Sequence, residues 1–117
     1  MAEKRGFTRI PVTLTAHCRI GNRFVRDAVA DLSEGGLYLK TREPAREVTP
    51  VRVAIAVPHV EGTTFGTLVG TVARVDRETR GILKGLGVSF DDTEMAQHDR
   101  TTLHGFIVGT GSDEHVQ

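Results

Sequence analysis

Apolar and polar side chains alternate from Ile10 to Ile20. A period of two residues brings every second side chain to the same face, so this segment predicts a half-buried β-strand. The apolar face of this strand carries Ile10, Val12, Leu14, Ala16, Cys18 and Ile20. Gly21-Asn22 predicts a turn, and residues 24–30 predict a second strand that pairs with the first in a hairpin.

Four more strand signals follow, separated by glycine, proline and charged residues. They lie at residues 37–41, 51–57, 65–75 and 85–90. We expect Pro58 to end the strand before it, and Gly66 and Gly70 to bend the long strand at 65–75. Acidic residues at 91–94 predict the start of a helix that continues to residue 108. This order predicts a mainly all-β domain, an antiparallel barrel or sandwich with a C-terminal helix.

The length and composition predict one globular domain in a reducing, cytoplasmic setting. The chain has 117 residues and a single cysteine, Cys18, which excludes an intramolecular disulfide. No apolar run reaches the roughly 20 residues that cross a bilayer, and the N-terminus lacks the apolar stretch of a secretory signal. We therefore expect no membrane insertion. The five histidines are scattered and predict no metal site, and Cys18 is expected to be a core thiol.

The formal net charge is zero, but its distribution along the chain is uneven. The first 30 residues hold six Lys and Arg against two acidic residues, whereas from Asp91 onward six acidic residues accompany Arg100 alone. A neutral total argues against a nucleic-acid partner, since duplex binders usually carry a basic face. The basic N-terminal arm favours a compact anionic ligand.

The segment Asp31-Leu32-Ser33-Glu34-Gly35-Gly36 concentrates a carboxylate, a hydroxyl and two glycines in one bend. Glycines allow a ligand or another chain to approach the backbone closely. Asp and Ser in a bend also have a purely structural explanation, because both side chains accept hydrogen bonds from backbone amides two residues on. The pattern D-x-S-x-x-G occurs by chance in only about a few per cent of chains of this length, which favours a functional interpretation.

A second pattern, Arg-x-x-x-Arg, lies at Arg5 and Arg9 in the N-terminal arm. The same spacing recurs twice at other arginines, so the pattern alone is weak evidence. Its position is informative, because a short arm before the first strand can fold back over the bend at Asp31. Residues 85–90, Gly-Leu-Gly-Val-Ser-Phe, form a third pattern near the end of the expected sheet.

In this order and spacing, the three patterns resemble the PilZ domain family over residues 4 to about 107. The resemblance implies a six-stranded antiparallel β-barrel with a C-terminal α-helix that binds the bacterial second messenger cyclic di-GMP. It divides the chain into a flexible arm (1–9), a barrel with its helix (10–108) and a disordered tail (109–117).

Guanine chemistry agrees with the site that the resemblance implies. A guanidinium can bridge guanine N7 and O6, and a carboxylate can accept from its N1–H and N2–H₂ groups. We assign Arg5 and Arg9 to guanine and phosphate contacts and Asp31 to the guanine donors. The remaining ligand-binding residues are Ser33, which would add a hydrogen bond to a base or phosphate, and Gly35 and Gly36, which permit close approach. For Lys4, the resemblance implies a role in ligand number, because a basic residue at this position of the family favours a stacked pair of ligands.

The sequence therefore predicts a stand-alone cyclic di-GMP receptor that relays binding to an unidentified protein effector. The family's outputs are motility, surface attachment with biofilm formation, and exopolysaccharide production. An alternative is a PilZ-like adaptor of a pilus or motility machine that binds no nucleotide. We do not expect an enzyme or a cofactor, since the sequence offers no paired carboxylates, metal cluster or activated nucleophile.

Overall fold

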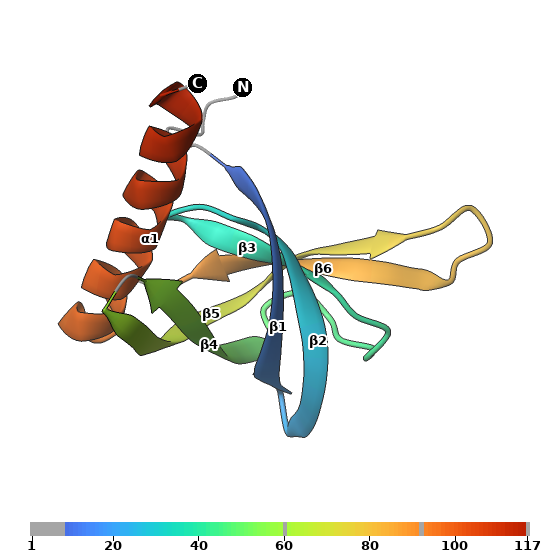
Figure 1. Cartoon of the computed structure of the whole chain (residues 1–117). Helices are drawn as coiled ribbons and strands as arrows, with labels where there is room; N and C mark the ends of the chain where they lie inside the picture. The colour runs from blue at the N-terminus through green and yellow to red at the C-terminus, as the bar shows by residue number, and fades with distance from the viewer. Residues whose placement is uncertain (1–8, 60, 92, 117) are drawn as a thin grey trace.

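Six antiparallel strands close into a barrel in the computed structural model, which describes residues 9–59, 61–91 and 93–116 (Figure 1). Their order around the barrel is β1-β2-β3-β6-β5-β4, and β4 pairs with β1 to close it. The strands are β1 (Ile10–Ile20), β2 (Arg23–Leu32), β3 (Gly36–Lys40), β4 (Pro50–His59), β5 (Gly62–Arg77) and β6 (Leu83–Phe90). The predicted mainly β fold is confirmed, and it is a barrel rather than a sandwich.

The alternation in the sequence becomes the inner and outer faces of the barrel. Ala16, Cys18 and Ile20 of β1 are buried, while the residues between them are exposed. The predicted hairpin is present, with Cys18 opposite Val25 and Gly21 at a φ of 59° in the turn. The largest fully buried side chains come from five strands and the helix: Leu32, Leu37, Leu39, Leu68, Leu86, Leu103, Val29, Val51, Val53 and Val72. β1 adds Ile10, Ala16, Cys18 and Ile20 to the same core. The sheet therefore encloses one apolar core.

Cys18 is a core thiol, as the sequence predicts. Its side chain is buried, and burial raises its pKa to about 11, with the nearby Asp27 carboxylate adding to the effect. Since the thiolate is the reactive form, the burial and the raised pKa both disfavour reaction of this thiol at neutral pH.

Helix α1 (Gln97–Val116) covers one end of the barrel (Figure 1). Leu103 and Ile107 are buried in the barrel core, together with Met95 from the turn before the helix. At the start of the helix, the Asp99 carboxylate accepts a hydrogen bond of 2.8 Å from the backbone N–H of Thr67 in β5. A Cβ at Gly66 would lie 3.5 Å from that carboxylate, in ordinary van der Waals contact, so the strand and the helix pack side by side here.

The ends of the helix differ from the sequence-based prediction. Asp91 does not begin it; its carboxylate accepts hydrogen bonds from the Thr93 N–H and hydroxyl in a separate turn, and these bonds lower the pKa of Asp91. The helical backbone then continues to Val116, past residue 108 and into the segment predicted as a tail. Glycine weakens a helix by about 1 kcal/mol but does not end it, and no proline follows residue 108.

Pro58 does not end its strand, contrary to the prediction. β4 continues to His59, with Pro58 opposite Thr63 of β5. The described pairing of β4 with β1 stops at Ala54, so Pro58 lies where β4 has a neighbour on one side, and a missing N–H is tolerated there. The predicted irregularity of β5 is present, but its register shifts follow Val72 and Asp76 rather than the glycines.

Candidate functional site

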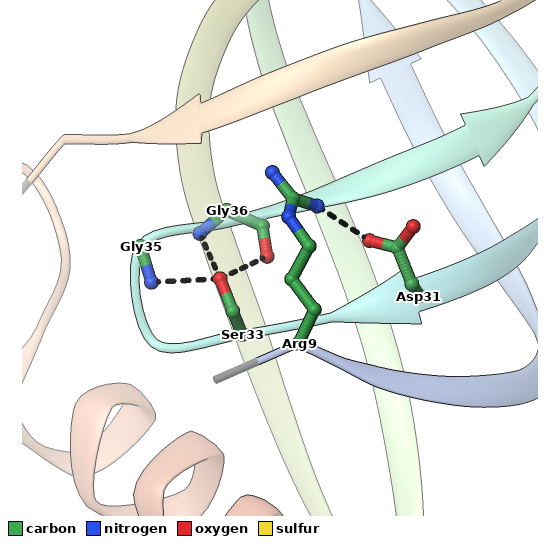
Figure 2. A network of polar contacts seen from close by, with 5 residues as sticks. All are labelled: Arg9, Asp31, Ser33, Gly35 and Gly36. Carbon is green, nitrogen blue, oxygen red and sulfur yellow. Dashed lines mark hydrogen bonds and ion pairs between the residues drawn. The ribbon is translucent and has the colours of Figure 1, made fainter. Parts of the chain in front are cut away.

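The arm and the Asp31 bend meet at the outer surface of the barrel. Arg9 immediately precedes β1, and Asp31 lies near the end of β2, opposite Pro11 on one side and Tyr38 on the other. Arg9 Nη1 lies 2.7 Å from Asp31 Oδ1 (Figure 2). The Arg9 side chain is 59% exposed and that of Asp31 is 32% exposed. The site therefore presents guanidinium donors and a carboxylate acceptor side by side to a ligand at the surface.

Ser33 shapes the bend between β2 and β3. Its hydroxyl accepts hydrogen bonds of 3.1 Å from the N–H groups of Gly35 and Gly36 and donates one of 3.3 Å to the Gly36 carbonyl (Figure 2). The Ser33 N–H donates to the same carbonyl at 2.9 Å. Ser33 is buried, with 3% of its surface exposed. These contacts match the structural explanation that the sequence left open for this serine.

Gly36 lies against the backbone of β6. A Cβ at this position would collide with the Val88 carbonyl oxygen, which faces it across the β3–β6 pairing. Gly35 is less tightly enclosed; its carbonyl accepts a hydrogen bond of 2.9 Å from the Phe90 N–H. The close approach that the glycines were expected to permit therefore exists at Gly36, and the approaching group is the neighbouring strand.

Glu34 joins this bend to the helix. Its Oε2 lies 2.9 Å from His104 Nδ1 on α1, and both side chains are partly exposed. The two residues are 70 positions apart in the sequence. The bend is thus connected to α1 as well as to β6.

Tyr38, the neighbour of Asp31 on β3, and two β5 residues that contact it, Arg74 and Asp76, extend the polar surface and were not predicted. Tyr38 pairs with Asp31 in the β2–β3 ladder, and its hydroxyl donates a hydrogen bond of 2.8 Å to Asp76 Oδ2 on β5. The Arg74 guanidinium lies 5.7 Å from the centre of the Tyr38 ring, within cation–π range. Burial and the hydrogen bond to Asp76 raise the pKa of Tyr38 to about 12.

The order of the strands explains why these residues meet. β3 and β5 both pair with β6, so the outer faces of the three strands are contiguous, and Gly87 of β6 leaves room for the Arg74 side chain that lies over it. In the sequence, the outward position of Tyr38 between Leu37 and Leu39 was a readable signal. Its proximity to Arg74 and Asp76 was not, because it depends on strand order.

Lys4 and Arg5, two of the predicted ligand-binding residues, lie outside the described residues. Of the predicted set, the structure brings Arg9, Asp31, Ser33, Gly35 and Gly36 to one edge of the barrel (Figure 2). Among residues 9–59, 61–91 and 93–116, no three His, Cys, Asp or Glu side chains gather in a way that could hold a metal ion. In the same part of the chain, no helix has the length and apolar character needed to cross a membrane.

Solved structures with the same fold come from several bacteria. The Bacillus subtilis inhibitor of motility (MotI/DgrA) is 16% identical with a TM-score of 0.78; the alignment covers 95% of this chain and 53% of that protein, so this chain spans about half its length. The PilZ domain of YcgR from Escherichia coli, solved with c-di-GMP, is 16% identical with a TM-score of 0.66, covering 96% of this chain and 95% of that domain.

A third structure, the PilZ domain of CeSA from a cellulose-synthesizing bacterium, is 22% identical with a TM-score of 0.62, covering 89% of this chain and 98% of that domain. Among curated proteins, no sequence matches this chain. The model of the PilZ domain matches residues 3–109, which include the whole barrel and part of the helix. The chain therefore belongs to the PilZ domain family.

Proposed function

We propose that this chain is a receptor that binds cyclic di-GMP over Arg9 and Asp31 and passes the binding event to a partner protein. The observation that carries the proposal is the contact of 2.7 Å between these two side chains, which joins the arm to the Asp31 bend at the surface. The E. coli relative with the same fold was solved with c-di-GMP, which supports the choice of ligand.

The chemistry of the pair suits guanine. The Arg9 guanidinium can donate to N7 and O6, and the Asp31 carboxylate can accept from N1–H and N2–H₂. Both side chains already lie at the surface, so a ligand can reach them without opening the core. Arg9 has donor groups beyond the one that contacts Asp31, and these remain available for a base or a phosphate.

Tyr38 and Arg74 extend the proposed site along the barrel. A tyrosine ring beside a guanidinium offers flat, polarisable surfaces on which a guanine can stack. The hydrogen bond from the Tyr38 hydroxyl to Asp76 holds the ring in place. A purine seated against Asp31 would have these groups beside it, because Tyr38 is the direct neighbour of Asp31 in the adjacent strand.

Ser33, Gly35 and Gly36 act in this proposal mainly through the shape of the bend. The Ser33 hydroxyl fixes the two glycine N–H groups, and Gly36 lets β3 pair closely with β6. A bend held in this way keeps Asp31 at a fixed position relative to Arg9. Preorganised side chains lose less entropy when a ligand binds, which increases affinity.

Lys4 and Arg5 complete the proposed site from the arm. Arg5 would share the guanine and phosphate contacts with Arg9, and Lys4 would favour a stacked pair of ligands. Binding would order the arm against the barrel and create a surface that a partner protein recognises. The processes under control would be motility, surface attachment or exopolysaccharide production. The likeness in fold to a B. subtilis inhibitor of motility favours the first of these.

Isothermal titration of the purified chain with cyclic di-GMP tests the proposal, with GTP and cyclic di-AMP as controls. We expect saturable heat with cyclic di-GMP alone. One ligand per chain would indicate a single molecule, and two would indicate the stacked pair that Lys4 favours. A folded sample that gives no saturable heat would refute the receptor and leave the nucleotide-free adaptor as the function.

A further inference from the structure

The turn of the β1–β2 hairpin lies away from α1 (Figure 1). Basic residues of β1, β2 and β4 form a surface around this hairpin. Its residues alternate along the outer faces of three adjacent strands. In the pairing of β1 with β2, His17 is opposite Arg26 and Arg19 is opposite Phe24. On its other side, Arg19 is opposite Arg52 of β4. We call this set of His17, Arg19, Phe24, Arg26 and Arg52 the basic hairpin face. All five side chains are exposed, and Phe24 reaches 80% exposure.

Arg19 and Arg52 flank an open hollow of about 390 Å³. The other lining residues are Gly21, Asn22 and Pro50, so the hollow has two cationic side chains and no carboxylate. Arg19 and Arg52 are direct cross-strand neighbours, and like charges in such a pair repel each other. Within the described part of the chain, no ion pair engages Arg19, Arg26 or Arg52, and Glu43 at the border is paired with Arg23 at 3.8 Å.

The position of Arg19 is set by two local contacts. Its Nε donates a hydrogen bond of 3.2 Å to the Gly21 carbonyl, and its guanidinium lies 5.8 Å from the centre of the Phe24 ring. The hydrogen bond to Gly21 uses Nε and leaves the two Nη groups of Arg19 for a ligand. Planar, fixed donors of this kind bind a carboxylate through two parallel hydrogen bonds.

The basic hairpin face is separate from the Arg9–Asp31 site. Arg9 precedes the first residue of β1 and Arg19 is its penultimate residue, so the two are about 30 Å apart along the strand at ~3.3 Å per residue. A partner can therefore occupy the hairpin end while a ligand lies over Arg9 and Asp31.

We propose that the basic hairpin face is a docking site for a carboxylate-rich segment of a partner protein. One acidic side chain occupies the hollow between Arg19 and Arg52, and an apolar group of the same segment packs on Phe24. Arginines beside an exposed aromatic ring are the composition of protein–protein hot spots. Anionic membranes and duplex DNA instead select larger clusters of basic residues, and this chain has zero net charge.

The test is an NMR titration of the full chain with the end-blocked peptide Glu-Glu-Phe-Glu-Glu. We expect amide shifts confined to the basic hairpin face. The double variant Arg19→Glu/Arg52→Glu should weaken binding by about tenfold or more, because both guanidinium contacts to the peptide carboxylate are lost and the new carboxylates repel the peptide. The matched control, Arg80→Glu/Lys84→Glu, makes the same change in charge at the β5–β6 hairpin and should bind within about twofold of the native chain. The peptide Gln-Gln-Phe-Gln-Gln should give no shifts.

Three results would overturn the proposal. The peptide could give no shifts, or the control variant could lose binding as fully as Arg19→Glu/Arg52→Glu, which would show that only net charge matters. Phosphatidylglycerol vesicles or a short DNA duplex could bind this face more tightly than the peptide, which would assign it to a membrane or a nucleic acid. The amide spectra of both variants report whether the barrel is intact.

Discussion

Arg9 Nη1 and Asp31 Oδ1 lie 2.7 Å apart at the surface of the barrel, although the two residues are 22 positions apart in the sequence. The pairing of β1 with β2 produces this contact, because Pro11 is opposite Asp31 and Arg9 lies just beyond it. Arg9, the last residue of the arm, therefore lies next to the Asp31 bend through the pairing of the two strands.

We predict that Asp31→Asn changes the free energy of unfolding by less than about 1 kcal/mol, because exposed ion pairs contribute little to stability. The Arg9 side chain is 59% exposed, and water screens the pair. Chemical denaturation measures the effect. A decrease of several kcal/mol in the free energy of unfolding would mean that Asp31 stabilises the barrel. The Arg9–Asp31 contact would then no longer support a role of Asp31 in ligand binding.

Ser33→Ala should destabilise the chain by about 1–3 kcal/mol, because it leaves buried N–H groups of the bend without their acceptor. The native hydroxyl makes hydrogen bonds to Gly35 and Gly36 and is buried. Ser89→Ala is the matched control, since Ser89 lies exposed on β6 and should tolerate the change. Equal denaturation midpoints for the two variants would show that the bend does not depend on the hydroxyl.

Gly36→Ala and Gly105→Ala should change stability in opposite directions. A Cβ at Gly36 collides with the Val88 carbonyl, so we expect a loss of about 1–3 kcal/mol or more. A Cβ at Gly105 meets nothing within 4 Å in the middle of α1, and alanine should stabilise the helix there by about 0.5–1 kcal/mol. Thermal denaturation compares the two. A neutral Gly36→Ala would contradict the close pairing of β3 with β6.

Tyr38 should titrate near pH 12. It is the only tyrosine and the chain has no tryptophan, so absorbance at long ultraviolet wavelengths reports this residue alone. The pKa is raised because burial and the hydrogen bond to Asp76 favour the neutral phenol. That stabilisation is fully present below the ordinary pKa of about 10 and is lost as pH rises toward 12. In Asp76→Asn the midpoint should fall; an unchanged midpoint would argue against the contact.

Much of the fold could be predicted because the strands carry their pattern locally. The alternation of residues 10–20 and the turn at Gly21-Asn22 are sufficient to specify the first hairpin, and β1 and β2 pair as expected. The helix boundaries and the role of Pro58 could not be predicted in the same way. The helix start depends on a local turn in which Asp91 contacts Thr93. The tolerance of Pro58 depends on which edge of β4 is paired, which is a tertiary feature.

The candidate site could be predicted only in part. The pattern of Asp31, Ser33 and Gly36 was visible in the sequence, but the different role of each residue was not. Ser33 contacts the bend itself and Gly36 contacts β6, whereas Asp31 faces outward to Arg9. Tyr38, Arg74 and Asp76 were missed because strand order alone brings β3 and β5 to the two edges of β6.

The most direct test of the account is a double-mutant cycle in cyclic di-GMP affinity with Arg9→Ala, Asp31→Ala and the double variant. Each single change should lower affinity by about 1–3 kcal/mol, because each removes a bidentate contact to guanine. The double variant should lose less binding free energy than the sum of the two single losses, because the effects of residues in contact are not additive. Arg80→Ala, at an exposed arginine of the β5–β6 hairpin, should bind as the native chain does. Native affinity in folded Arg9→Ala and Asp31→Ala would contradict the proposed site.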